Sequence, residues 1–362
     1  MQENSKVGKA LLPWYCIPVL ALLFSVTQTL TACSKKSGEV PPSGSGTLVT
    51  PPLTNPIGTT KPHGGNCCLV SNTDDATKLI EVYDPADTPW TNVKWSWKPA
   101  AALGYAPADI SLWAGGTDVK LRNCTLFGGS QVIIAASYGL VTIAAYPEGM
   151  KKWSLGFTGD VQLHGVELLP SGNSLVANAD PTNGYIAVIA SSQPAPYNMV
   201  YTTYRAPSAH AVLWDSSHNC VWALSDTLMK YTVSGTPENP ALTLVSRYNL
   251  PTRWGHDLSA YTTDSNLMWV STNSGTYIFN KTNGGFQAVA GDAQGTFVKG
   301  LSDQPGKNQI VESRQDLEGC TFNAWCTKTI RFFDLGTGTQ TGTRTVNTAA
   351  FYKSKTFDPY YY

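Results

Sequence analysis

The sequence carries little charge, and the charge that it has is balanced. Asp, Glu, Lys and Arg make up 14% of the 362 residues, with 25 basic and 25 acidic side chains. A typical soluble domain contains about 25% charged residues. Because there is no basic excess, nucleic acid is not expected as the main partner. The shortage of charge also argues against a charged disordered chain and against a long solvated coiled coil.

Apolar runs long enough to cross a membrane are absent after the first thirty residues. Before that point, a basic start precedes an apolar stretch over residues 10–30, and Leu-Thr-Ala stands directly before Cys33. This layout predicts a signal peptide over residues 1–32. It resembles the processing box of bacterial lipoproteins, which implies that Cys33 is lipidated. The alternative is an uncleaved membrane helix, which two prolines in the stretch disfavour.

The segment that follows the apolar stretch lacks a hydrophobic period. Residues 33–62 are rich in Ser, Gly, Pro and Thr and predict a disordered tether. Residues 63–362 then form the folded domain. We therefore expect an exported protein of the cell envelope, held by a lipid anchor to a bacterial membrane. The outer membrane is favoured, with the domain in the periplasm or at the cell surface.

Spacings typical of zinc sites are also missing. Neither Cys-x-x-Cys nor His-x-x-x-His occurs, although six cysteines follow Cys33. An exported protein tolerates disulfides, and Cys320 and Cys326 are close enough in sequence to close a small loop.

A helical period is not convincing in any segment, whereas 32 Gly and 23 Pro predict a turn-rich, all-β protein. Three segments align with one another and begin at His164, His210 and His256, each 46 residues after the last. Each reads as an apolar strand, a polar turn and a second apolar strand. Similar segments occur near Asp118 and Lys299, and a first unit lies within residues 67–83.

A period of 40–50 residues with several short strands per unit is typical of a β-propeller. One blade cannot bury both of its faces, so blades stack in a ring and share their apolar surfaces. Residues 66–350 hold six such units, with seven blades as the alternative. The tail at residues 351–359 is placed to supply a strand that closes the ring. Most of the Trp and Tyr side chains are expected between the blades.

In a propeller the first strand of each blade lines the channel, so equivalent positions of successive blades become neighbours around one mouth. This prediction applies to Asp118, His164, His210, His256 and Lys299. The ends of the second strands and the segments before the histidines add Asp180, Asp226, Asn273, Arg205 and Arg253. A histidine in a repeat often only bonds neighbouring backbone. Three of only five histidines at one equivalent position, with charges beside them, favour a functional site.

Two chemistries suit such a cluster. Neutral imidazoles of His210 and His256 can bind a divalent metal such as zinc, with Asp226 or water completing the ligand shell. Alternatively, a histidine acts as base beside an arginine that neutralises the carboxylate of a uronic acid, and a tyrosine protonates the leaving oxygen. Asp118, Asp180, Lys299 and Arg253 are then candidates for substrate binding.

The segments His164–Pro170, Ala209–Asp215 and Gly255–Ser259 together resemble blade motifs of the ulvan-lyase-like propellers and of related propeller lipoproteins from Gram-negative polysaccharide users. The resemblance covers residues 66–355 and is concrete at these three motifs. It implies that His164 is catalytic and that His210 and His256 bind a structural zinc ion. It further implies Arg205 as the arginine that binds the carboxylate, and Tyr204 or Tyr185 as the catalytic tyrosine.

One departure from these lyases concerns the chemistry. They have a second catalytic histidine soon after the first motif, and this chain has none between His164 and His210. Either a tyrosine takes its place, or the chemistry differs, or the protein binds without cleaving. The expected function is thus a propeller that acts on or binds a polysaccharide or oligosaccharide, with lyase-type β-elimination as the enzymatic version. The alternative is a non-catalytic glycan-binding or interaction propeller.

Overall fold

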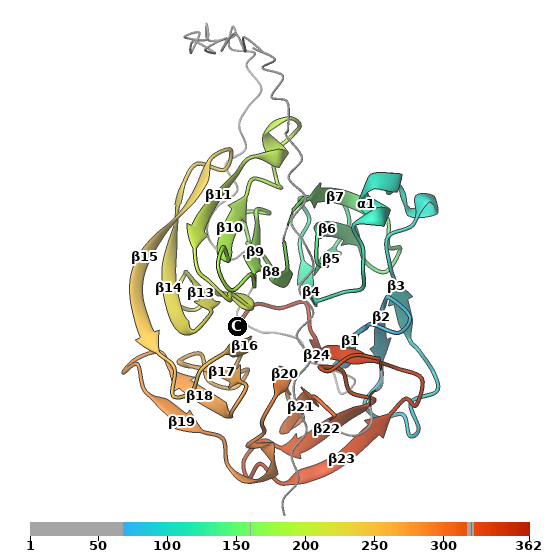
Figure 1. Ribbon diagram of the computed structural model, residues 1–362, viewed down its shortest axis with the longest axis vertical. Helices are drawn as coiled ribbons and strands as arrows, with labels where there is room; N and C mark the ends of the chain where they lie inside the picture. The colour runs from blue at the N-terminus through green and yellow to red at the C-terminus, as the bar shows by residue number, and fades with distance from the viewer. Residues whose placement is uncertain (1–67, 160, 317–319, 321) are drawn as a thin grey trace, which may run out of the picture. The chain divides into compact units, whose positions relative to one another are not determined.

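The computed structural model describes residues 68–362, except residues 160, 317–319 and 321. In this part of the chain, six four-stranded antiparallel sheets surround a central channel (Figure 1). The predicted all-β, six-bladed propeller is therefore confirmed. The predicted signal peptide, the lipidation site Cys33 and the tether lie outside the described residues. No helix within residues 68–362, with the gaps just given, is long and apolar enough to cross a membrane.

We number the blades in chain order and give each from the innermost strand outward. Blade 1 contains β24 (Phe351–Phe357), β1 (Leu69–Asp74), β2 (Leu79–Tyr83) and β3 (Trp95–Trp97). Blade 2 contains β4 (Asp118–Asn123), β5 (Gln131–Ala136), β6 (Leu140–Ala145) and β7 (Lys151–Gly156). Blade 3 contains β8 (Leu163–Leu168), β9 (Ser174–Asn178), β10 (Tyr185–Ile189) and β11 (Tyr201–Arg205).

The other three blades repeat this plan. Blade 4 contains β12 (Ala211–Asp215), β13 (Cys220–Leu224), β14 (Thr227–Gly235) and β15 (Pro240–Asn249). Blade 5 contains β16 (Gly255–Ala260), β17 (Leu267–Thr272), β18 (Thr276–Asn280) and β19 (Phe286–Ala288). Blade 6 contains β20 (Val298–Gln304), β21 (Gln309–Arg314), β22 (Thr329–Asp334) and β23 (Gln340–Thr345). The short helices are η1 (Ala101–Leu103), α1 (Pro107–Ser111), η2 (Tyr197–Met199) and η3 (Gly291–Ala293).

Blade 1 joins the two ends of the described chain. Its innermost strand β24 pairs with β1, with Leu69 opposite Phe357, so the red and blue ends meet in Figure 1. The predicted closing strand is thus present. The first repeat in the sequence begins with what is the second strand of its blade, because the inner strand comes from residues 351–357.

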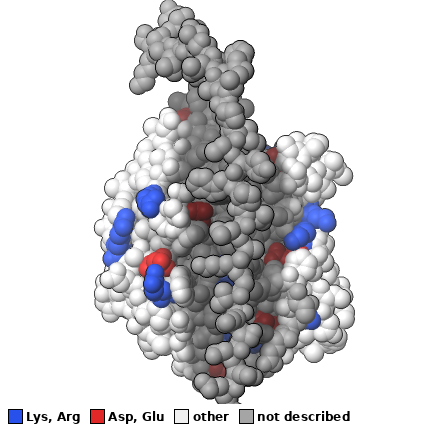
Figure 2. Space-filling model, viewed as in Figure 1, with Lys and Arg blue, Asp and Glu red and all other residues white. Residues whose placement is uncertain are grey.

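Apolar side chains fill the space between neighbouring blades. Among the described residues, each of six apolar clusters joins one blade to the next, including the pair formed by blades 6 and 1. Trp222 and Trp269 are fully buried in two of these clusters, as expected for the aromatic residues. Complete burial of one large apolar side chain contributes about 1.5–3 kcal/mol. The exterior is sparsely charged on the face shown in Figure 2.

The inner strands approach one another closely enough to position the site. A Cβ atom on Gly165 of β8 would lie only 2.7 Å from the Cα atom of Ala211 in β12, so glycine is needed there. The residues directly before these two are His164 and His210. In β8 the register skips His164 between Leu163 and Gly165, which makes a β-bulge. Such bulges redirect a side chain at the rim of a sheet.

Candidate functional site at the histidine mouth

Three histidines from consecutive blades lie side by side at one mouth of the channel, which we call the histidine mouth. The ring centroids of His164 and His210 are 4.9 Å apart, and those of His210 and His256 are also 4.9 Å apart. Nδ1 of His164 lies 3.0 Å from the hydroxyl oxygen of Tyr352, and Tyr138 meets the same imidazole edge-on. The structure therefore brings together three residues that are 46 positions apart in the sequence.

Blade 6 adds a cation to this row. Nζ of Lys299 lies 2.8 Å from Nε2 of His256 and 3.4 Å from Oδ1 of Asn273. Oδ1 of Asn273 also lies within hydrogen-bond distance of the same imidazole nitrogen. Like His164, both His256 and Lys299 lie at register shifts of their strands. The same local device thus turns all three side chains toward the histidine mouth.

Burial keeps the imidazoles of this cluster neutral. It lowers the pKa of His210 to about 4, and it holds the pKa values of His164 and His256 well below their ordinary value. Burial, followed by the charge of Lys353, lowers the pKa of Lys299 to about 8. At neutral pH the cluster therefore combines three uncharged imidazoles with one ammonium group that is still largely protonated.

Some ring nitrogens at the histidine mouth have no hydrogen-bond partner. Nε2 of His164 and Nδ1 of His256 are buried and unpartnered within the described part of the chain. Nδ1 of His210 is 2.8 Å from the backbone oxygen of Ser208, which can only accept, so Nε2 of this ring keeps its lone pair. A buried polar atom without a partner costs about 1–3 kcal/mol. Water, an ion or a ligand group can supply the partner that each of these atoms lacks.

Asp118 does not reach the rim and lies one layer deeper than expected. Its Oδ2 accepts the backbone N–H of Val166 at 3.0 Å, as Oδ2 of Asp257 accepts that of Leu301 at 3.0 Å. Asp118 therefore corresponds to Asp257, the residue after His256, rather than to the histidine itself. The repeat between blades 2 and 3 is one residue longer than the 46-residue spacing implied.

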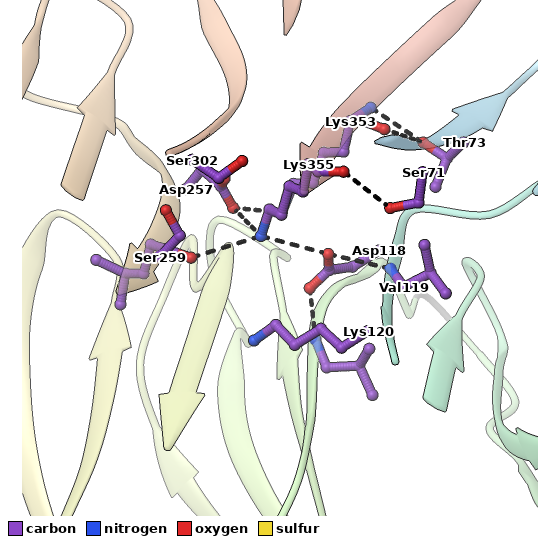
Figure 3. A network of polar contacts seen from close by, with 12 residues as sticks. Ser71, Thr73, Asp118, Val119, Lys120, Asp257, Ser259, Ser302, Lys353 and Lys355 are labelled. Carbon is purple, nitrogen blue, oxygen red and sulfur yellow. Dashed lines mark hydrogen bonds and ion pairs between the residues drawn. The ribbon is translucent and has the colours of Figure 1, made fainter. Parts of the chain in front are cut away.

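An ion-pair network supports the histidine mouth from inside the channel (Figure 3). Nζ of Lys355 lies 2.6 Å from Asp257 and 3.5 Å from Asp118. Although burial opposes ionisation, Lys355 and two further lysines hold the pKa of Asp118 below its ordinary value. Nζ of Lys353 donates to the backbone oxygens of His164 and His210, at 2.7 and 3.1 Å. This lysine thus ties the two histidine-bearing strands together.

The predicted arginine and tyrosines lie at the outside of blade 3. Arg205 ends β11 opposite Tyr185 of β10. Two strands separate β11 from β8, which places Arg205 about 14 Å from the inner strand. The hydroxyl of Tyr204 accepts the backbone N–H of Leu242 at 2.7 Å, and Tyr185 packs against the apolar cluster between blades 2 and 3. The structure does not join these three side chains to His164.

The remaining predicted residues lie in turns. Oδ1 of the exposed Asp226 accepts the backbone N–H of Trp254 at 3.1 Å. Burial lowers the pKa of His210, and the charge of Asp226 opposes that effect. The guanidinium of Arg253 lies over the ring of Trp254, at 5.6 Å. Asp180 instead accepts the backbone N–H of Thr182, at 2.9 Å, within its own turn.

The nitrogens at the histidine mouth differ in what they can offer a metal ion. Nε2 of His164 and Nε2 of His210 can be neutral donors of the kind that zinc prefers. Nδ1 of His256 carries the ring proton when Nε2 accepts from Lys299, so it is not a metal donor in this arrangement. However, no three His, Cys, Asp or Glu side chains in the described ranges are arranged to hold a metal ion. The ammonium group of Lys299 also lies beside His256 and would repel a divalent cation.

The opposite end of the channel is covered by the C-terminal tail, residues 358–362. Its backbone oxygens accept N–H groups of Asn123 and Ser216, and the hydroxyl of Tyr361 donates to the backbone oxygen of Leu168 at 2.6 Å. The tail runs across the centre of Figure 1 to the C mark. The tail helps to line a cavity of about 70 Å³ inside the channel, and Lys120 and Lys355 also line it.

Glu167 is the centre of the contacts at this end. Its carboxylate accepts two hydrogen bonds from Arg122, at 2.8 and 2.9 Å, and one from Lys120, at 3.1 Å. The backbone N–H groups of Leu168 and Trp214 donate to it as well. Burial opposes ionisation of Glu167, but Arg122 and Lys120 hold its pKa below the ordinary value.

The comparisons with known proteins show family and fold. Residues 73–285 match the family model described as "Family of unknown function (DUF6528)". The chain belongs to this family. None of the curated proteins compared with it matches.

The structure shows this member of the DUF6528 family to be a propeller, and a solved structure has a similar fold. A protein of unknown function from Bacteroides caccae is similar with a TM-score of 0.55 and 10% identity, over 80% of this chain and 98% of that chain. A chain of the mitotic checkpoint complex is similar with a TM-score of 0.43 and 13% identity, over 62% of this chain and 64% of that chain. The first similarity supports the fold alone.

Sequence reasoning missed three contributors to the histidine mouth. Tyr352 and Lys353 belong to the closing strand, and Tyr138 lies between β5 and β6. The signal for the first two was the predicted closing strand itself, because its start must reach the same mouth as the histidines. Nothing in the repeat pattern singled out Tyr138.

Proposed function

We propose that this propeller is a lipid-anchored envelope protein that binds a uronate-containing polysaccharide or oligosaccharide at the histidine mouth. The observation that carries the proposal is the row of three neutral imidazoles ended by the ammonium group of Lys299. Lys299 supplies the positive charge for a sugar carboxylate. The imidazoles supply hydrogen-bond donors and acceptors for hydroxyl groups. The resemblance of the three histidine motifs to ulvan-lyase-like propellers supports the same substrate class.

Binding is tested by calorimetry with a panel of acidic and neutral oligosaccharides. We expect Lys299→Met to weaken binding of an acidic ligand at least tenfold, because the carboxylate loses its partner, and Lys299→Arg to retain part of it. Lys94→Met is the matched control, since Lys94 pairs with Asp87 away from the histidine mouth. Equal affinity of the Lys299→Met variant and the wild type would reject the proposal.

β-Elimination is the second candidate, and the contact between His164 and Tyr352 favours it. If Nδ1–H of His164 donates to the Tyr352 hydroxyl, then Nε2 is a free base. His164 would take the proton from C5 of the uronate, the C4–O bond would break and a C4=C5 double bond would form. Tyr138, whose pKa burial raises, keeps the proton that the leaving oxygen needs. Arg205, Tyr204 and Tyr185 have no part in this version.

The elimination is tested by the ultraviolet absorbance of the unsaturated product. We expect activity on an acidic polysaccharide that His164→Ala abolishes while ligand binding persists. Absence of product from every ligand that binds would reject catalysis and leave the binding proposal standing.

A zinc ion at the histidine mouth is a further proposal. His210 and His256 would be its ligands, with Asp226 or water completing the shell. When bound, the ion would provide a Lewis acid next to the sugar. Elemental analysis of the purified protein tests it, with His210→Ala and His256→Ala as the decisive variants. A metal content unchanged in both variants would reject this site.

The lipid anchor requires its own test. We expect wild-type protein to incorporate labelled fatty acid and to sediment with membranes. The Cys33→Ser variant should do neither. Membrane association that survives this substitution would instead favour the uncleaved helix.

A further inference from the structure

Two large aromatic side chains are exposed directly beside the histidine mouth. Trp254 is 52% exposed and Phe297 is 36% exposed, and each stands two residues before a mouth residue, His256 or Lys299. Both have a positive φ, 60° for Trp254 and 57° for Phe297. Bulky residues rarely adopt this conformation, and it costs on the order of 1 kcal/mol or more.

The equivalent position in blade 4 shows that the backbone does not need an aromatic residue there. Ser208 stands two residues before His210 and has a φ of 59°. A small polar side chain is therefore sufficient for this turn. Trp254 and Phe297 combine a strained backbone with an exposed apolar ring, and neither feature stabilises the fold. The combination indicates a role in contact with a ligand.

Hydrogen bonds hold these aromatic residues in one continuous arc. The backbone N–H of Asn273 donates to the oxygen of Trp254 at 3.0 Å, and the N–H of Phe297 donates to the oxygen of Asn273 at 2.8 Å. The oxygen of Phe297 in turn accepts the N–H of Gln315 at 3.2 Å. The side chain of the same Asn273 contacts His256 and Lys299. The arc is thus attached directly to the row of imidazoles.

The loop between β21 and β22 carries two more exposed aromatic residues on this face. Phe322 is 52% exposed and Trp325 is 50% exposed, between the disulfide-bonded Cys320 and Cys326. The side chain of Asn323 donates to Asp75 of blade 1 at 2.7 Å, which anchors this part of the loop beside the neighbouring blade.

Basic side chains lie over two of these aromatic rings. Arg253 lies over Trp254 at 5.6 Å, and Nζ of Lys78 lies over Phe322 at 5.0 Å. Arg253 and Lys78 therefore place two basic side chains against exposed aromatic surface, and the buried Lys299 adds a third positive charge beside the arc. The faces of pyranose rings stack on aromatic side chains, and carboxylates pair with basic ones. This combination matches an acidic sugar chain in both shape and charge.

We propose that Trp254 and Phe297 form additional subsites, continued by Phe322 and Trp325, for the sugars that follow the uronate bound at Lys299. The ligand is then an acidic oligosaccharide several units long rather than a single sugar. This inference rests on the proposed function for the nature of its ligand. It adds the length of the ligand and the direction in which it runs, over blades 5 and 6 toward blade 1.

The test is affinity as a function of ligand length, measured with uronate oligomers of one to six units. We expect the wild type to bind longer oligomers at least tenfold more tightly than the monomer. Trp254→Ala and Phe297→Ala should each remove most of that gain and leave monomer binding unchanged. Lys299→Met should weaken binding at every length. Trp254→Phe, which keeps a ring, should retain most of the gain.

Tyr197→Ala is the matched control. Tyr197 is 53% exposed in η2, which follows the far end of β10 and so lies on the opposite face. Its loss should leave both affinities unchanged. Binding that depends on Lys299 but not on ligand length would overturn the subsites and leave the proposed function intact. Failure of every acidic oligomer to bind would reject both.

Discussion

At the histidine mouth, ring nitrogens of His164 and His256 are buried without partners, whereas at the tail-covered end Glu167 accepts hydrogen bonds from Arg122, Lys120 and two backbone N–H groups. Both ends are built from the same six inner strands. The difference lies in their titratable groups, because the tail-covered end also holds two buried polar atoms without a hydrogen-bond partner, Nε1 of Trp214 and Oε1 of Gln304, within the described residues. A fully paired buried network stabilises and specifies a fold, whereas unpaired groups lower stability unless an outside partner completes them. The comparison therefore indicates a structural role for the network around Glu167 and supports the ligand site proposed at the histidine mouth.

The largest loss of stability is expected for Glu167→Gln. It leaves Arg122 and Lys120 buried without their counter-charge, which should lower the free energy of unfolding by about 4 kcal/mol. Denaturant unfolding measures the change. Asp87→Asn, which breaks a half-exposed pair with Lys94, is the control and should cost less than about 1 kcal/mol. Similar losses of unfolding free energy in both variants would show that the buried network contributes no more to stability than an exposed ion pair.

The tail should account for the next largest effect. Tyr361 is buried, and its hydroxyl donates to the backbone oxygen of Leu168. The centroid of its ring lies 4.8 Å from the guanidinium carbon of Arg122. Tyr361→Ala should cost about 3 kcal/mol in unfolding free energy. Tyr361→Phe, which removes only the hydroxyl, should cost about 1 kcal/mol. Thermal and denaturant unfolding of the two variants separate packing from hydrogen bonding. Equal losses would assign the whole effect to the hydroxyl.

A smaller effect is expected from pH, and it belongs to the histidine mouth. The pKa of His210 is about 4 in the folded state, against about 6.5 in an unfolded chain. Between these values the unfolded state binds a proton that the folded state does not. Stability should therefore fall as the pH falls, by about 2 kcal/mol between pH 6.5 and pH 5 from this group.

Urea unfolding at several pH values measures this slope. His164 and His256 act in the same direction, since burial lowers their pKa values too. The His210→Asn variant should show a shallower slope than the wild type. An unchanged slope would mean that His210 does not titrate as its surroundings imply.

The smallest change in stability is expected for His164→Ala. This substitution removes Nε2, a buried nitrogen without a partner, but it also removes the contact of Nδ1 with the Tyr352 hydroxyl. We expect the relieved desolvation to offset most of the lost contact and packing, to within about 1 kcal/mol. Turnover of an acidic polysaccharide should fall far more than the free energy of unfolding, whereas ligand binding should persist. A loss as large as that of Glu167→Gln would show that the histidine mouth is structural as well.

Much of this architecture could be predicted from the spacing of three histidines. Because equivalent positions of adjacent blades meet, a period of 46 residues places His164, His210 and His256 together, and the pattern of strands and turns indicates six blades. The segment at residues 351–359 is placed to supply the closing strand. These inferences need only the repeat length and the geometry of a stacked sheet.

The sequence could not predict two kinds of detail. One is a shift of a single residue within the repeat, and the other is whether a residue lies on an inner or an outer strand of its blade. Asp118 is one residue away from the position equivalent to the histidines, so a uniform period placed it at the rim instead of inside the channel. Arg205 is on the expected face, but sequence distance to His210 does not reveal that β11 is the outermost strand. The positive φ values of Trp254 and Phe297 beside the histidine mouth could not be predicted from composition either.

The pairing of β24 with β1 also has a consequence for biosynthesis. Residues 351–357 supply Tyr352 and Lys353 to the histidine mouth and complete the first blade. A nascent chain that has not yet released these residues from the ribosome has neither a closed ring nor an assembled site. Ligand binding at the histidine mouth should therefore appear only after translation has passed these residues, and chains truncated before residue 351 should be recognisable as unfinished by their lack of it.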